Sequence, residues 1–289
     1  MWEIGKDWLL WDRINNGRLG NDLITYQYLR SRNVQNIPLV KEMYSLSAPT
    51  DKVQFTMMSR AKGVPLGNIW HTLSEEKKQV YRNQVTAALR EMRQFTAPFP
   101  QKVDGTPLHD MIIGRCKPSA AKCKSIGKTK EEWFNNMADE IRYGISKLLK
   151  TKDETIIQER FQQLLNNCPD SGPCVLSHCD LNRNNIIVDA KNEKIEAIID
   201  WEHAGFYPPW AERWFSLVYR HGDLMGPIWE ELCPDVDNEA FWTAIVHPLD
   251  EVIEAWRECP IEHSDEGDIW FQPRFCKCQP YGGKIYERL

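Results

Sequence analysis

Three short β-rich runs interrupt the second half of this chain, which is otherwise patterned as helices. They read "CVLSHCD", "NNIIVDA" and "KIEAIIDWE", and polar turns separate them. The turn at 190–193 predicts that residues 186–188 and 195–199 pair as a hairpin. That hairpin brings Asn185, which precedes one strand, close to Asp200, which follows the other.

The side chains at that end of the predicted hairpin suit a hard cation. Mg²⁺ prefers carboxylate and other oxygen donors together with phosphates, and Asn185 and Asp200 offer such oxygens. Asp180 then lies on a loop facing the metal, where it can accept a proton from an attacking hydroxyl. This is the layout of phosphoryl transfer on a kinase-like fold. The order HxDxxxxN, hydrophobic hairpin and IDW is far more specific than HxD alone.

At these residues the chain resembles a known family. "HCDLNRNNIIV" and "IIDWEHAGFYPPW" resemble the signature of the aminoglycoside phosphotransferase and choline kinase-like family, especially its fungal members of unassigned substrate. "NIPLVKEM" and "MMSRAKGVPLGNIWHTLSEEKK" extend the resemblance upstream, over about residues 1–220. It implies an α+β, two-lobed protein-kinase-like fold. A reduced N-terminal β lobe is expected at 1–62 and a larger, mainly helical C-terminal lobe at 63–289.

The resemblance also implies roles for individual residues. Asp180 is the expected catalytic base, and Asn185 and Asp200 are the expected ligands of Mg²⁺. His178 is expected to orient the catalytic loop without shuttling protons. The expected hinge, whose backbone meets the adenine of ATP, is Ser59, Arg60 and Ala61.

The departures from the family pattern lie mostly on the nucleotide side. The family has a lysine in a setting like "WLLKDR", which pairs with phosphates and with a glutamate on the next helix. Here the setting reads "WLLWDR", so the lysine position is Trp11, and the glutamate corresponds to Asp22. The glycine between the catalytic histidine and aspartate is Cys179. No glycine-rich loop precedes Trp2, so the first strand pair is expected to be truncated or absent.

An indole cannot supply the cation that a triphosphate requires. By analogy with other preorganised groups, losing one well-placed cation costs about 3–4 kcal/mol of transition-state stabilisation. Lys6, Arg13 and Arg183 are candidate replacements. Arg183 belongs to the catalytic loop itself, although a surface salt bridge is an equally ordinary role for it.

Three functions fit these residues. The first is an ATP- and Mg²⁺-dependent kinase of a small hydroxylated molecule, because Asp180, Asn185 and Asp200 are retained together. The second is an enzyme on the same scaffold that isomerises, cyclises or dehydrates a natural product without nucleotide. Trp11, Asp22 and the missing glycine loop motivate it. The third is a non-catalytic binding module.

Composition restricts the partners of this 289-residue chain. A net charge of -5 argues against a nucleic-acid partner. No apolar run approaches the roughly 20 residues of a membrane-spanning helix, and the N-terminus lacks a signal segment. A cytoplasmic protein with a small-molecule partner and no membrane is expected, and the sequence does not indicate the oligomeric state. Nine cysteines fit reduced thiols. A metal set is conceivable among Cys259, His263, Cys276 and Cys278, but ordinary thiols are favoured.

The remaining pattern predicts further elements. Residues 2–11 read as a strand or hairpin arm, "NDLITYQYLRSR" as a short helix, and "IPLVKEMYSL" and "KVQFTMMSRA" as strands. Ser74 is the expected N-cap of another helix, and the recurrence from Trp133 to Leu148 predicts one long helix. Eight acids between Asp250 and Asp268, with Trp256, Trp270 and Phe271, fit a solvated acidic face or an acceptor site for a cationic or aromatic amine.

Overall fold

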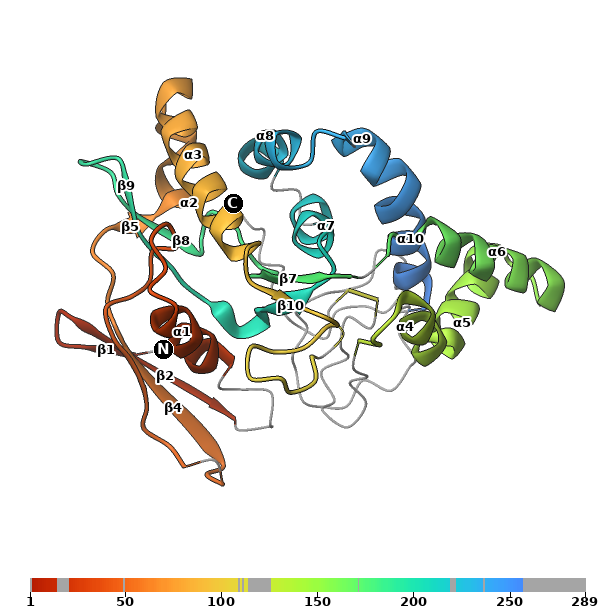
Figure 1. The fold of residues 1–289 in the computed structure, drawn as a ribbon, viewed down its shortest axis with the longest axis horizontal. Coiled ribbons are helices and arrows are strands. Elements are labelled where there is room, and N and C mark those ends of the chain that lie inside the picture. The colour runs from red at the N-terminus through yellow and green to blue at the C-terminus, as the bar shows by residue number, and fades with distance from the viewer. Residues whose placement is uncertain are drawn as a thin grey trace, which may run out of the picture.

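The computed structural model describes residues 2–14, 21–48, 50–108, 110, 112–113, 126–170, 172–218, 222–235 and 237–256. Expectations for the cysteine and histidine set and for the acidic tail beyond Trp256 lie outside these residues. The fold is α+β, with β-sheet in the N-terminal part and mainly helices in the C-terminal part (Figure 1). The domain boundary at residue 62 stays a prediction.

The N-terminal part is built on an antiparallel sheet with strand order β1-β2-β4-β3. Gly5, at a φ of 64°, makes the turn between β1 and β2, so the N-terminal run is a hairpin. β1 is three residues long. Helix α1 crosses the sheet (Figure 1). The bounds are β1 (Trp2–Ile4), β2 (Trp8–Ile14), α1 (Asn21–Ser31), β3 (Met43–Ser45) and β4 (Val53–Ser59).

Register assigns the residues of this sheet to its two faces. Leu9 lies opposite Met58, and Met58 lies opposite Met43. Met58 and Met43 are buried in one cluster with Tyr26 of α1, so this inner face is covered by the helix. Side chains alternate along a strand, so Trp11, two residues after Leu9, also belongs to the inner face. Trp11 packs against the same cluster.

Two small sheets hold the segments that carry the polar motif. One has the order β5-β8-β9 and the other β10-β7-β6. Gly63, at a φ of 136°, leads into β5, and a Cβ there would lie 2.1 Å from the carbonyl oxygen of Val188. This close approach therefore requires glycine. The bounds are β5 (Val64–Pro65), β6 (Thr96–Ala97), β7 (Cys174–Ser177), β8 (Ile186–Asp189), β9 (Lys194–Ile198) and β10 (Gly205–Tyr207).

Helices make up most of the C-terminal part. Ser74 caps α3 as expected, because its Oγ accepts a hydrogen bond from the backbone N–H of Lys77. The helices are α2 (Leu66–Ile69), η1 (Trp70–Thr72), α3 (Glu75–Met92), α4 (Lys130–Asn136), α5 (Ala138–Leu148), α6 (Glu154–Asn167), η3 (Trp201–His203), α7 (Ala211–Val218), α8 (Gly222–Leu232), α9 (Asn238–Phe241), η4 (Trp242–Val246) and α10 (His247–Trp256).

Two expectations for elements were wrong in detail. The predicted long helix from Trp133 is two helices, because Met137, at φ -108° and ψ 13°, ends α4 and begins α5. Its apolar spacing survives the break because Ile141 and Ile145 are still buried. The strand expected over "IPLVKEMYSL" is confined to β3. Among the described residues, no helix is both long and apolar enough to cross a membrane.

Candidate active site

The predicted hairpin is confirmed and brings the two expected metal ligands together. Ile186 pairs with Ile198, and Asp189 pairs with Lys194. One step beyond the ladder, the backbone N–H of Ile199 donates to the carbonyl oxygen of Asn185 at 2.9 Å. Asn185 therefore lies directly beside the residue that precedes Asp200.

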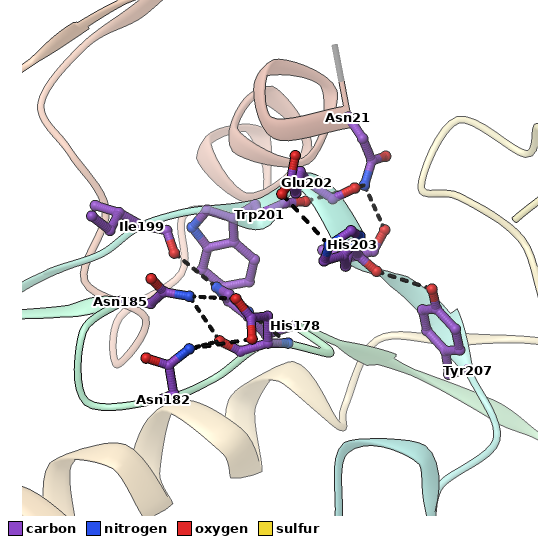
Figure 2. A network of polar contacts seen from close by, with 11 residues as sticks. Asn21, His178, Asn182, Asn185, Ile199, Trp201, Glu202, His203 and Tyr207 are labelled. Atoms are coloured by element: carbon purple, nitrogen blue, oxygen red, sulfur yellow. Dashed lines mark hydrogen bonds and ion pairs between the residues drawn. The ribbon is translucent and has the colours of Figure 1, made fainter. Parts of the chain in front are cut away.

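Two asparagines hold the carboxylate of Asp180. Asn185 Nδ2 donates to Asp180 Oδ2 at 2.9 Å and to the Asp180 carbonyl oxygen at 2.8 Å. Asn182 Nδ2 donates to Oδ1 at 3.2 Å and to the same carbonyl at 3.0 Å (Figure 2). Asp180 is half-buried and Asn185 is buried. Because Nδ2 is the atom of Asn185 used here, its Oδ1 is the atom that can coordinate a cation.

His178 is a buried neutral histidine that ties the catalytic loop to the hairpin. Its Nε2 lies 2.9 Å from the Ile199 carbonyl oxygen, and its Nδ1 accepts a hydrogen bond from the Asp180 backbone N–H at 3.2 Å. A single tautomer, with the proton on Nε2, satisfies both contacts. Burial lowers the pKa of His178 to about 4. This geometry fits an orienting role and gives the ring no contact through which to shuttle a proton.

Cys179 occupies the position where the family pattern has glycine, and its backbone explains that glycine. Its φ is 61°, in the left-handed region that side chains with a Cβ rarely adopt. The conformation turns two successive backbone N–H groups, those of His178 and Cys179, toward Glu212 Oε2 at 2.5 and 2.8 Å. Glu212 thus holds the backbone of the catalytic loop through these two bonds. The burial of Glu212 raises the pKa of its carboxyl group to about 7.

Three carboxylates converge at the end of the hairpin. Oxygens of Asp22, Asp200 and Glu202 all lie within 4.8 Å of one another. Asp200 adopts the left-handed conformation, with φ 67° and ψ 54°, immediately before η3. An all-oxygen donor set of this charge fits Mg²⁺. The Asp22 carboxylate therefore lies beside that of the expected metal ligand Asp200. The resemblance had instead assigned Asp22 to the position of the glutamate that pairs with the family lysine.

Asn21 explains why the first turn of α1 reaches this cluster. Its Nδ2 lies 3.1, 2.9 and 2.7 Å from the carbonyl oxygens of Trp201, Glu202 and Ala204, so its two hydrogens are shared among three acceptors (Figure 2). The side chain is buried, so these bonds fasten the start of α1 to the segment after Asp200. The neighbouring Asp22 is held beside the other carboxylates as a result.

Trp11 lies in an apolar cluster that joins the N-terminal sheet to the hairpin. The buried members include Met58 of β4 and Ala197 of β9. Trp11, Ala61 of the expected hinge and Ile199 pack against the same cluster. The indole therefore shares its surroundings with the segment expected to meet adenine.

The expected hinge follows β4 and already uses part of its backbone. The N–H of Ser59 donates to the Glu42 carbonyl oxygen at 2.9 Å, and that of Arg60 donates to the Asp7 carbonyl oxygen at 2.7 Å. The Arg60 guanidinium pairs with Glu3 at 3.2 Å. Within the described part of the chain, Ser59 and Arg60 thus have backbone partners, so Ala61 is the hinge residue whose N–H we would test as a donor to a ligand.

Of the three candidate replacements for the missing lysine, Lys6 and Arg183 have described side chains. The Arg183 guanidinium donates to Asp223 Oδ2 at 2.8 Å and lies 5.9 Å from the ring centre of Trp70. Its observed partner is therefore Asp223 of α8, which agrees with the salt-bridge role considered for Arg183 from the sequence. Lys6 is exposed in the turn between β1 and β2. The side chain of Arg13 lies outside the described residues.

Comparisons with known proteins identify the family. The profile of the phosphotransferase enzyme family (APH) matches residues 18–236. The chain belongs to this family. No curated protein matches it.

Solved structures show the same fold at low sequence identity. Aminoglycoside phosphotransferase APH(4)-Ia is 17% identical, with a TM-score of 0.54 over 88% of this chain and 78% of that one. Aminoglycoside 2'-phosphotransferase-IIIa, solved with GDP, is 14% identical, with a TM-score of 0.55 over 87% and 76%. ADP-bound APH(2'')-Ib is 16% identical, with a TM-score of 0.53 over 89% and 83%. The kinase-like fold that the resemblance implied is confirmed.

Three residues of the site were missed from the sequence. Glu202 follows the IDW signature directly, so its closeness to Asp200 was a usable signal. Asn21 opens a predicted helix, where its residue type suggests a local cap and not a long-range anchor. Glu212 lies 32 residues after Asp180, and nothing local indicates that its carboxylate faces the catalytic loop.

Proposed function

We propose that this protein is an ATP- and Mg²⁺-dependent phosphotransferase that acts on a hydroxyl group of a small molecule. One observation carries the proposal: Asn185 donates to the Asp180 carboxylate while its backbone is bonded to the residue before Asp200. The expected base and the expected metal ligands thus form one connected unit.

Each residue has a distinct part in the proposed reaction. Asp180 accepts the proton of the acceptor hydroxyl as its oxygen bonds to the γ-phosphorus of ATP, and the bond to the ADP oxygen breaks. Asn182 and Asn185 hold the carboxylate in place. Asp200 and Asn185 hold Mg²⁺, which neutralises phosphate charge, and Asp22 and Glu202 add oxygen donors beside them. The products are ADP and a phosphomonoester.

Additional carboxylates offer a way to work without the family lysine. Asp22 and Glu202 lie beside Asp200, so the three carboxylates together would hold divalent cations more firmly, and these would supply the positive charge that Trp11 cannot offer the triphosphate. The apolar cluster around Trp11 and Ala61 offers the adenine ring of ATP an uncharged surface. The acceptor remains defined only as a small hydroxylated molecule.

The proposal is tested by an untargeted search for small molecules that the protein phosphorylates. The protein is incubated with Mg-ATP and a small-molecule extract, and products heavier by one phosphoryl group are sought by mass spectrometry. Such products should form with the natural protein and disappear with Asp180→Asn. Asp189→Asn, at the far end of the same hairpin, is the matched control. Absence of nucleotide binding at millimolar Mg-ATP would overturn the proposal.

Trp11 favours a second candidate function. Its indole packs against the cluster that an adenine would be expected to contact. An indole packed in this way, together with the three carboxylates that converge at the end of the hairpin, suits nucleotide-independent acid–base chemistry on an apolar natural product. Turnover without nucleotide that is abolished by Asp180→Asn or Asp200→Asn would establish this candidate, and strict ATP dependence would exclude it.

A further inference from the structure

The outer face of the N-terminal sheet carries a largely apolar surface, interrupted by Asp12, which lies opposite Phe55. Trp2 lies opposite Leu10, Leu10 opposite Met57, and Met57 opposite Tyr44, so one row of neutral side chains crosses all four strands. This row lies on the face opposite Leu9 and Met58, because neighbouring residues of a strand point to opposite faces. Helix α1 covers the other face.

Most of the exposed large apolar side chains of the described residues gather here. Eleven such side chains are exposed, and six belong to this sheet or to the residue after β3. Their exposed fractions run from 37% to 61%. The six, which we call the outer patch, are Trp2, Ile4, Tyr44, Leu46, Val53 and Phe55.

Register places the outer patch on one face. Ile4 lies opposite Trp8, and Trp8 is two residues from Leu10 on β2. The ring of Trp8 reaches that of Tyr44, with centroids 6.1 Å apart. Phe55 lies two residues from Met57, and the Leu46 N–H donates to the Phe55 carbonyl oxygen. The aromatic and aliphatic groups therefore form one surface and are not scattered around the sheet.

We propose that a second copy of this chain packs face to face on the outer patch. A sheet is stable when both apolar faces are buried, and two sheets commonly stack about 10 Å apart. The proposal is independent of the reaction proposed above.

The charges on this face favour a second copy over other partners. The row across the four strands carries no charged side chain. Asp12, beside it on β2, has a carboxylate that accepts a hydrogen bond from Trp2 Nε1 at 3.0 Å. A nucleic acid, an anionic lipid surface or a charged peptide would find no complementary charges in this row. The apolar side chains of an identical face are self-complementary under a two-fold axis, and the Asp12 carboxylate of each copy keeps its bond to Trp2.

The area is also sufficient for a dimer. Given the roughly 150–250 Å² of an aromatic side chain, the exposed parts of the outer patch amount to about 600 Å². That value lies at the upper end of what monomers expose. Two such faces together bury about 1,200 Å², the lower limit of stable interfaces. A dimer of modest affinity, with a dissociation constant of about 1–100 μM, is therefore expected.

The test measures the mass of the full chain by light scattering and sedimentation from about 1 to 200 μM. The natural protein should rise toward twice its 33.8 kDa. Phe55→Glu and Leu46→Glu should each remain at the monomer mass. Tyr143→Glu, which changes an equally exposed aromatic side chain of α5, is the matched control and should dimerise like the natural protein.

Thermal unfolding of every variant separates lost association from lost folding. The substituted side chains are exposed, so the melting temperatures of monomeric variants should agree within a few degrees. A natural protein that stays monomeric over the whole range would overturn the proposal. So would folded Phe55→Glu and Leu46→Glu proteins that associate as the natural protein does.

Discussion

Asn185 donates a hydrogen bond of 2.9 Å from Nδ2 to Oδ2 of Asp180, and its carbonyl oxygen accepts one of 2.9 Å from Ile199. One asparagine thereby links the proposed base to the hairpin that ends at Asp200. Substitutions of individual residues can therefore test the roles of Asp180 and of Asp200 separately.

Removing the proposed base should stop transfer without unfolding the protein. Asp180→Asn keeps the shape of the side chain and removes the proton acceptor, so kcat should fall by about 10²–10⁴-fold. The measurement is the rate of ADP formation in the presence of acceptor. Asp189→Asn should leave that rate within about twofold, since this half-buried carboxylate accepts its bonds from Lys191 and Asn192 of its own hairpin turn, at the far end from Asp180. Comparable losses in both variants would contradict a specific role for Asp180.

Glu212 predicts a stability that falls as the pH rises. Its pKa is about 7 in the folded protein against an ordinary 4.5, so the folded state favours the protonated form. This contribution is fully present below pH 4.5 and is lost as the pH passes through 7, a change of about 3 kcal/mol.

Glu212→Gln isolates that contribution because an amide oxygen can still accept from the loop N–H groups. The free energy of unfolding of the natural protein minus that of the variant, measured in urea, should decrease from pH 5 to pH 8. A difference that is constant over this range would contradict the raised pKa of Glu212.

His178 predicts the opposite slope. Its folded pKa is about 4 against an ordinary 6.5, so the folded state favours neutral imidazole. The contribution is present above pH 6.5 and is lost as the pH falls through 4, again by about 3 kcal/mol. His178→Asn removes the titration, so the stability gap between the two proteins should narrow from pH 7 to pH 4.5. An imidazole resonance of His178 that titrates near 6.5 by NMR would contradict a buried neutral ring.

The hairpin and the catalytic loop were accessible from the sequence because they are local. Residues 174–202 carry alternating strand and turn signals, and the ladder from Ile186 to Asp189 fixes which ends meet. The sequence likewise indicated Cys179 as a departure, although only the backbone, at φ 61°, gives the physical reason for glycine there.

Other parts of the site depend on tertiary packing and could not be predicted. The position of Asp22 is set by three bonds from Asn21 to a segment about 180 residues away. Glu212 reaches the loop because β10, which precedes α7, pairs with β7, the strand that leads into the loop. The break at Met137 divides a helix whose apolar period continues across it, so the spacing alone could not reveal it.

Restoring the family lysine should strengthen nucleotide binding. A lysine at position 11 adds one charge-assisted contact to phosphate, so Trp11→Lys should lower the Kd for Mg-ATP about tenfold or more. Trp11→Leu is the control, because it removes the same indole and stays apolar. The comparison is made by calorimetric titration. Equal affinities in the two variants would show that charge at this position does not matter for nucleotide binding.

The most direct test of the central claim is a calorimetric titration of the natural protein with Mg-ATP, repeated with Asp200→Asn and Asp189→Asn. A phosphotransferase that uses the carboxylates beside Asp200 should bind Mg-ATP, lose at least about tenfold in affinity with Asp200→Asn, and be unchanged with Asp189→Asn. No binding to the natural protein at millimolar Mg-ATP, or equal binding by all three proteins, would contradict the account.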